Sequence, residues 1–100
     1  MEVKLNAIDF SADQNLIKFI NERVEKLETF FDKIITANAT LKTEEAAGKE
    51  NKQVEIELSI PGKNIFAKKN GKSFEEATDN AVEALRRQLR KHKAKDSKVL

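Results

Sequence analysis

The chain has 100 residues, of which 39% are hydrophobic and 36% are charged, and its formal net charge is +2. This length is enough for one domain with one modest core. There is no cysteine, which excludes disulfide bonds and thiolate metal sites. No apolar stretch reaches the length of a signal-peptide core or a membrane span, so we expect a cytoplasmic protein.

The first elements are indicated by alternation and then by helical spacing. Apolar and polar residues alternate over 3–7, which predicts a half-buried strand. Ser11 and Gln14 have the spacing of a capping box, so a helix is predicted over 12–32. The apolar residues expected on its buried face are Leu16, Ile17, Ile20, Val24, Leu27 and Phe31.

Three further strands and a second helix are expected after it. Alternation predicts strands over 35–41 and 54–60, with a polar loop between them, and a turn at 61–64 leads into a short strand over 65–69. A second capping box, Ser73 with Glu76, starts a helix that should reach residue 92 or beyond. Its buried stripe is predicted to contain Phe74, Ala77, Ala81, Leu85 and Leu89.

This order, β-α-β-β-β-α, predicts an α+β fold. Both amphipathic helices must cover apolar surface, and the apolar face of the sheet is the only large candidate. We therefore expect a two-layer sandwich with a four-stranded sheet and two helices packed on one face. The first two strands should be parallel if they are neighbours, because a helix connects them. Residues 1–95 form the single domain, and residues 96–100 are expected to be a frayed tail.

Catalytic chemistry has little support. The chain contains one histidine, His92, and no tyrosine or tryptophan. His92 falls near the end of the second helix, at the angle of its buried stripe. It can be read as a general base, but a packing or capping role is favoured, because a cation suits the end of a helix. We expect no enzymatic activity, no cofactor, no metal site and no small-molecule substrate.

The most informative segment is 85–95, in which six of eleven residues are basic and none is acidic. On a helical wheel, two basic ridges lie away from the buried stripe, with Arg86, Arg90 and Lys93 in one and Arg87 and Lys91 in the other. The helix dipole explains two or three late bases but does not explain six, since like charges three and four residues apart repel. A polyanion, above all the phosphate backbone of RNA, is the better explanation.

Charge along the chain agrees with an anionic partner. Residues 1–62 contain 8 basic and 12 acidic residues, a net charge of −4, whereas residues 63–100 contain 11 and 5, a net charge of +6. Near the last strand, this basic part also contains Lys63, Lys68, Lys69 and Lys72. They can extend the basic surface, or they can simply protect an edge strand from pairing. In that strand, Ile65 and Ala67 should face inward, and Phe66 and Lys68 outward.

The chain resembles the short ribosome hibernation promoting factors, a family that includes ribosome-associated inhibitors. The similar segments are 26–34, 41–42, 74–77 and 87–93, and the resemblance covers residues 1 to about 95. It implies the β-α-β-β-β-α fold and binding to the small ribosomal subunit, in the channel between head and body. A member of this family blocks translation there during stasis, as in stationary phase or stress.

The resemblance also implies which residues bind ribosomal RNA: Arg86, Arg87, Arg90, Lys91 and Lys93 on the second helix, together with Lys68, Lys69 and Lys72. The loop 44–52 and the positions around Thr78 depart from the family pattern, so no site is assigned there. The extension that pairs ribosomes in long-form members is absent, so ribosome dimerisation would need a second factor. The alternative from a different class is a protein-interaction module that docks an acidic partner through the basic helix.

Overall fold

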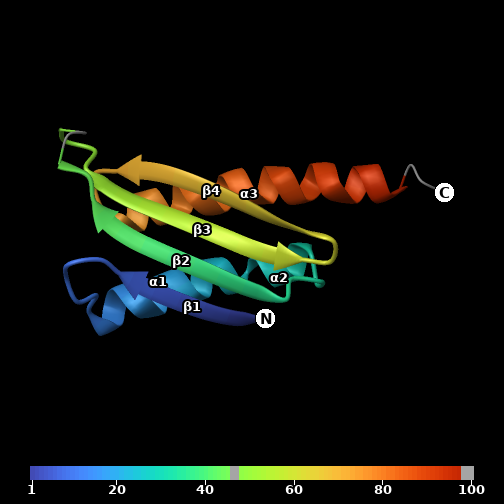
Figure 1. Cartoon of the computed structure of the whole chain (residues 1–100), viewed down its shortest axis with the longest axis horizontal. Helices are drawn as coiled ribbons and strands as arrows, with labels where there is room; N and C mark the ends of the chain where they lie inside the picture. Colours follow the sequence, from blue (N-terminus) through green and yellow to red (C-terminus); the bar gives the residue numbers. More distant parts are fainter. Residues whose placement is uncertain (46–47, 98–100) are drawn as a thin grey trace.

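A computed structural model describes residues 1–45 and 48–97, the last three by their backbone alone. The predicted α+β order is confirmed (Figure 1). The elements are β1 (Glu2–Ala7), α1 (Gln14–Glu25), α2 (Leu27–Phe30), β2 (Thr36–Thr43), β3 (Lys52–Ile60), β4 (Lys63–Gly71) and α3 (Phe74–Ser97). No helix within these described ranges is long and apolar enough to cross a membrane.

The four strands form one sheet in the order β1-β2-β3-β4. As expected, β1 is parallel to β2, and the other two pairs are antiparallel. The helices lie on one face of the sheet, with α1 behind β1 and β2 and α3 behind β4 (Figure 1). The chain is therefore a two-layer sandwich, with one sheet face covered and the other open.

The core lies between the sheet and the helices. The inward residues of β3, from Val54 to Ile60, are buried, as alternation predicted. The strand predicted over 35–41 is β2, but the alternation that would place Ile35 inward with Ala37 fails at its start, because Ile35 is 55% exposed. The segment between α2 and β2 instead buries Phe31 and Ile34, which fill that end of the core before the strand pairing begins at Thr36.

The first helix departs from its predicted bounds. Its N-cap is Asp13, whose Oδ1 accepts a hydrogen bond from the backbone N–H of Leu16 at 2.8 Å, so the capping box expected at Ser11 is wrong. The carboxylate of Asp13, three residues before the buried Leu16, caps the helix instead. The predicted single helix over 12–32 is also interrupted at Lys26, which separates α1 from α2.

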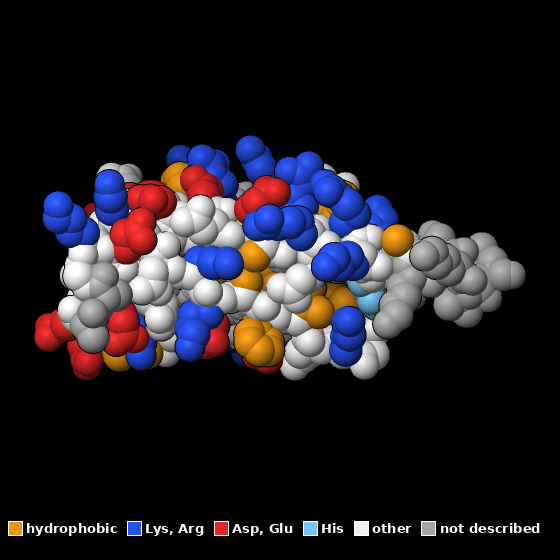
Figure 2. Space-filling view, turned by 90° about the horizontal axis from the view of Figure 1, so that it is seen from above, with side chains coloured by type: hydrophobic (Ala, Val, Ile, Leu, Met, Phe, Trp, Pro, Cys, Tyr) orange, Lys and Arg blue, Asp and Glu red, His pale blue; other side chains and the backbone are white. Residues whose placement is uncertain are grey.

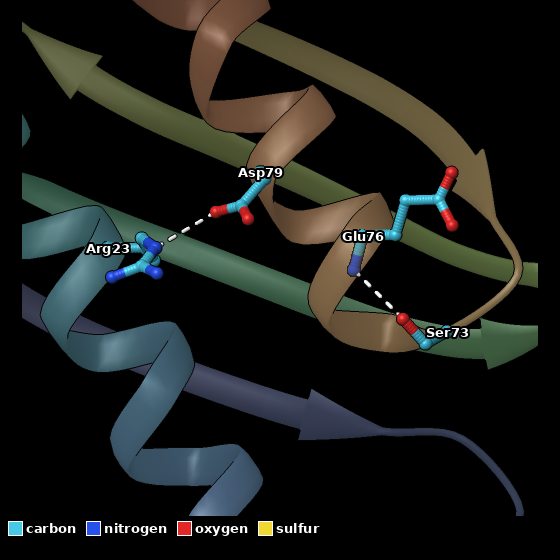
Figure 3. Close-up of polar contacts among 4 residues, drawn as sticks. All are labelled: Arg23, Ser73, Glu76 and Asp79. Carbon is cyan, nitrogen blue, oxygen red and sulfur yellow. Dashed lines mark hydrogen bonds and ion pairs between the residues drawn. The ribbon is translucent and has the colours of Figure 1, made fainter.

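The last helix begins as predicted. Ser73 Oγ accepts a hydrogen bond from the N–H of Glu76 at 3.1 Å (Figure 3), and Glu76 Oε2 accepts one from the N–H of Lys72 at 3.2 Å. Gly71, the last residue of β4 and two residues before Ser73, allows a close approach of strand and helix. A Cβ atom at Gly71 would lie 2.8 Å from the backbone nitrogen of Ala77.

The buried stripe of α3 contains the predicted Ala77, Ala81, Leu85 and Leu89, all completely buried. Phe74 is only half-buried and stacks on Phe10, with ring centroids 5.0 Å apart. Thr78 is also completely buried, which the predicted stripe did not include. The helix continues to Ser97, and residues 98–100 lie outside the described part, so the expected tail stays a prediction.

Candidate nucleic-acid interface

The second half of α3 is held against the sheet by Leu85 and Leu89, which are completely buried. The basic residues of this half, Arg86, Arg87, Arg90, Lys91 and Lys93, are all exposed. The structure therefore places the five predicted residues of α3 on one rigid element. The side chain of Lys95, the sixth basic residue of the segment, lies outside the described part.

One flank of α3 faces α2. Lys93 Nζ donates a hydrogen bond to the carbonyl oxygen of Phe30 at 2.9 Å and lies 4.8 Å from the centroid of its ring. The Cζ atom of Arg86 lies 5.7 Å from the same centroid. Both cations are therefore positioned over one aromatic side chain, which reduces the freedom they would lose on binding an anion.

The other flank of α3 faces β4. Gln88 Nε2 donates a hydrogen bond to the carbonyl oxygen of Phe66 at 2.9 Å. Beyond it, Lys91 and His92 line a small hollow together with Lys63 of β4. Lys63 of β4 therefore lies beside the basic residues of α3.

The remaining predicted lysines point in different directions. Lys68 faces outward on the open sheet face, as does Phe66, which is 61% exposed. Lys69 is the cross-strand partner of the buried Val54, so it lies at the edge of the covered face. Lys72 precedes α3, at the end opposite the basic residues. The structure does not bring these three lysines together.

His92 has a packing role. Its ring contacts Phe31 edge to face, with centroids 5.6 Å apart and planes at 73°. The capping role considered for it is wrong, because α3 continues for five more residues. Among the described side chains, no three of His, Asp and Glu converge as metal ligands.

Arg23 of α1 and Lys26, which lies between α1 and α2, were missed as candidate site residues in the sequence. Arg23 and Lys26 line a groove of about 480 Å³ between α1–α2 and α3, opposite Arg86. Arg23 Nε donates to Asp79 Oδ1 of α3 at 2.9 Å (Figure 3), and its Cζ lies 4.4 Å from the ring centroid of Phe19. Phe19, Arg23 and Lys26 are four and three residues apart, which places them on one face of a helix. This spacing was the available signal in the sequence, but only packing shows that the face is turned toward α3.

Figure 2 views the molecule from the side of β4 and α3. Toward the C-terminal end of this face the charged side chains in view are Lys or Arg, whereas Asp and Glu appear near the middle and toward the other end. The acidic residues of α3 are confined to its first half among the described side chains, with Glu83 the last of them. The positive field is therefore concentrated where the basic ridges lie.

The family model for sigma 54 modulation proteins and S30EA ribosomal proteins matches residues 3–97. The chain belongs to this family. Over 100 residues it is 31% identical to the ribosome hibernation promoting factor of Pseudomonas putida, covering all of this chain and 94% of that protein. Over 95 residues it is 30% identical to the ribosome hibernation promoting factor of Escherichia coli K12, covering 95% and 96% of the two chains.

Solved structures share this fold. A ribosomal subunit interface protein from Coxiella burnetii has a TM-score of 0.83 at 19% identity, covering 94% of this chain and 99% of that one. The N-terminal domain of Protein Y from Thermus thermophilus has a TM-score of 0.78 at 22% identity, covering 92% and 99%. These two likenesses show the shared fold, and the family resemblance predicted from the sequence is confirmed.

Proposed function

We propose that this protein binds the small ribosomal subunit through ribosomal RNA in the decoding channel and sterically blocks translation during stasis, without a catalytic step. The observation that carries the proposal is the second half of α3, where two buried leucines hold a helix that exposes five cations. The relatives named ribosome hibernation promoting factors support the same function. The protein would act in the cytoplasm, where ribosomes work.

Binding would depend mainly on phosphate contacts. Arg86, Arg87 and Arg90 offer planar guanidinium groups that can hold two phosphate oxygens at once, and Lys91 and Lys93 add point charges. Because the helix is rigid, the spacing of these groups is set before binding, and little conformational entropy is lost. Arg23 and Lys26 widen the surface toward α1, while Lys68, Lys69 and Lys72 would make separate, peripheral contacts.

The deciding experiment is co-sedimentation with purified small subunits. The test variant reverses Arg87, Arg90 and Lys91 to glutamate, because these exposed side chains form no ion pair or hydrogen bond with the described residues. We expect sedimentation to be lost while the melting temperature stays nearly unchanged. A matched control reverses Lys4 of β1, Lys18 of α1 and Lys49 of the loop before β3, which are all exposed, and so changes the net charge equally.

Retained sedimentation of the α3 variant would end the proposal, and equal loss in the control would reduce it to a non-specific charge effect.

The alternative, a module that docks a protein partner, is favoured by one observation, the exposed ring of Phe66 on the open sheet face. Ribonuclease treatment separates the two functions. A complex with a protein partner survives it, whereas a complex held by ribosomal RNA does not.

A further inference from the structure

The groove between α1–α2 and α3 has a composition unlike the rest of the basic surface. Its apolar lining is formed by Leu27, Phe30 and Val82, and its basic residues are Arg23, Lys26 and Arg86. At about 480 Å³ it lies within the usual range for pockets that take small organic groups, roughly 300–1,000 Å³. It can therefore hold more than a single phosphate.

Two carboxylates also line the groove. Asp79 pairs with Arg23 at 2.9 Å, and Glu83 lies 3.9 Å from Arg86. Three cations against two carboxylates leave the lining only weakly positive, which is poorly suited to a second or third phosphate. Carboxylate oxygens accept hydrogen bonds, so they suit a ligand that carries both a negative charge and N–H donors.

We propose that this groove receives one unstacked nucleotide of RNA. The inference rests on the proposed function and deepens it, because it assigns a base-binding role to one part of the surface. The base would lie against the apolar lining and the Arg86 guanidinium, whose other face is turned to the Phe30 ring. Its N–H groups would meet Glu83, and its phosphate would meet Lys26.

The groove is organised before any ligand enters. Arg23 is held from two sides, by Asp79 and by the ring of Phe19 at 4.4 Å. Figure 3 shows the guanidinium of Arg23 directed across the gap between α1 and α3 toward Asp79. The Arg23 side chain is therefore already placed across the groove, and an entering base would not have to order it.

The experiment is a titration of the free protein with guanosine 5′-monophosphate, followed by the amide resonances of Phe30 and Val82. Ribose 5-phosphate, which has the phosphate but no base, is titrated in parallel. We expect the nucleotide to shift these lining resonances and ribose 5-phosphate to leave them in place. Equal shifts with both ligands, or no shift with either, would overturn the proposal.

Two variants test the assigned contacts. Arg86→Lys keeps the charge but removes the planar face, and Glu83→Gln removes the charged acceptor while keeping the side-chain length. Each should weaken nucleotide binding by about fivefold or more. Glu75→Gln is the matched control, since Glu75 is an exposed acid of the same helix outside the groove. Unchanged affinity in both test variants would contradict the contacts proposed here.

This titration needs no ribosome, so its outcome is independent of the sedimentation experiment. If the lining resonances do not move but the protein sediments with small subunits, the groove proposal fails and the proposed function stands. If the protein does not sediment but the nucleotide shifts the lining, the proposed function fails and the groove remains a nucleotide site.

Discussion

The side-chain amide of Gln88 donates a 2.9 Å hydrogen bond to the carbonyl oxygen of Phe66, which joins α3 to the outer strand of the sheet. An edge strand presents backbone groups that can pair with another chain, and this bond occupies one of them. Leu85 and Leu89, which are completely buried, set which face of α3 is turned to the sheet, and the Gln88 bond adds a polar contact beside them.

Replacing Gln88 with methionine should destabilise the protein by about 0.5–1.5 kcal/mol, since the donor is lost and the side-chain length is kept. Urea unfolding followed by circular dichroism measures the change. The neighbouring exposed residue serves as control, and Arg87→Met should change the free energy of unfolding by less than about 0.5 kcal/mol. Equal effects of the two substitutions would show that the hydrogen bond contributes nothing.

Leu89→Ala should destabilise the protein by about 2–5 kcal/mol, because it leaves a cavity where a completely buried side chain packs. The same unfolding measurement tests it, with the adjacent exposed Arg90→Ala as the control. Because Leu89 holds the basic part of α3 on the sheet, binding to ribosomal subunits should also weaken as the variant approaches its melting temperature. A loss below 1 kcal/mol would mean that this leucine does not anchor the helix.

Gly71 and Gly62 should respond differently to asparagine. Gly62 has φ +88°, in the region that asparagine tolerates better than alanine, and nothing lies within 4 Å of its Cβ position. Gly71 is limited by space, since its Cβ would lie 2.8 Å from Ala77 N. Thermal unfolding should therefore show Gly62→Asn to be milder than Gly62→Ala, whereas both changes at Gly71 should cost about 1–3 kcal/mol.

If Gly71→Ala proves neutral, the strand and helix are free to separate at this junction. If asparagine and alanine are equivalent at Gly62, its left-handed backbone conformation is not what requires glycine there.

The ion pair between Arg23 and Asp79 should contribute little stability although it joins two helices. The side chains are 37% and 52% exposed, so solvent screens the pair. A double-mutant cycle with Arg23→Gln and Asp79→Asn should give a coupling energy of about 0.2–1 kcal/mol that falls with added salt. A coupling energy that does not change with salt would show that the pair is shielded from solvent.

The affinity for small subunits should depend steeply on salt. If about four to six phosphates are contacted, the logarithm of the binding constant should fall with the logarithm of the salt concentration at a slope of about −3 to −5. Sedimentation across a salt series measures the slope. A slope near zero would rule out binding through phosphate contacts.

The sequence by itself determined the order of elements, the sheet residues that face inward and the amphipathic character of α3. These properties are local, since alternation and helical spacing depend on neighbours a few residues apart. The cap at Ser73 followed from the same short-range pattern and is present. The basic residues from Arg86 to Lys93 could be assigned to the exposed face from the sequence as well. Helical spacing identifies the buried stripe, and the remaining positions of the helix are then the exposed ones.

Only the tertiary structure decided the rest. The interruption at Lys26, the exposure of Ile35 and the position of Lys63 beside Lys91 of α3 depend on how the segments pack. The groove that brings Arg23 to Asp79 joins residues 56 positions apart. No local pattern encodes that distance, because it results from two helices covering the same face of one sheet.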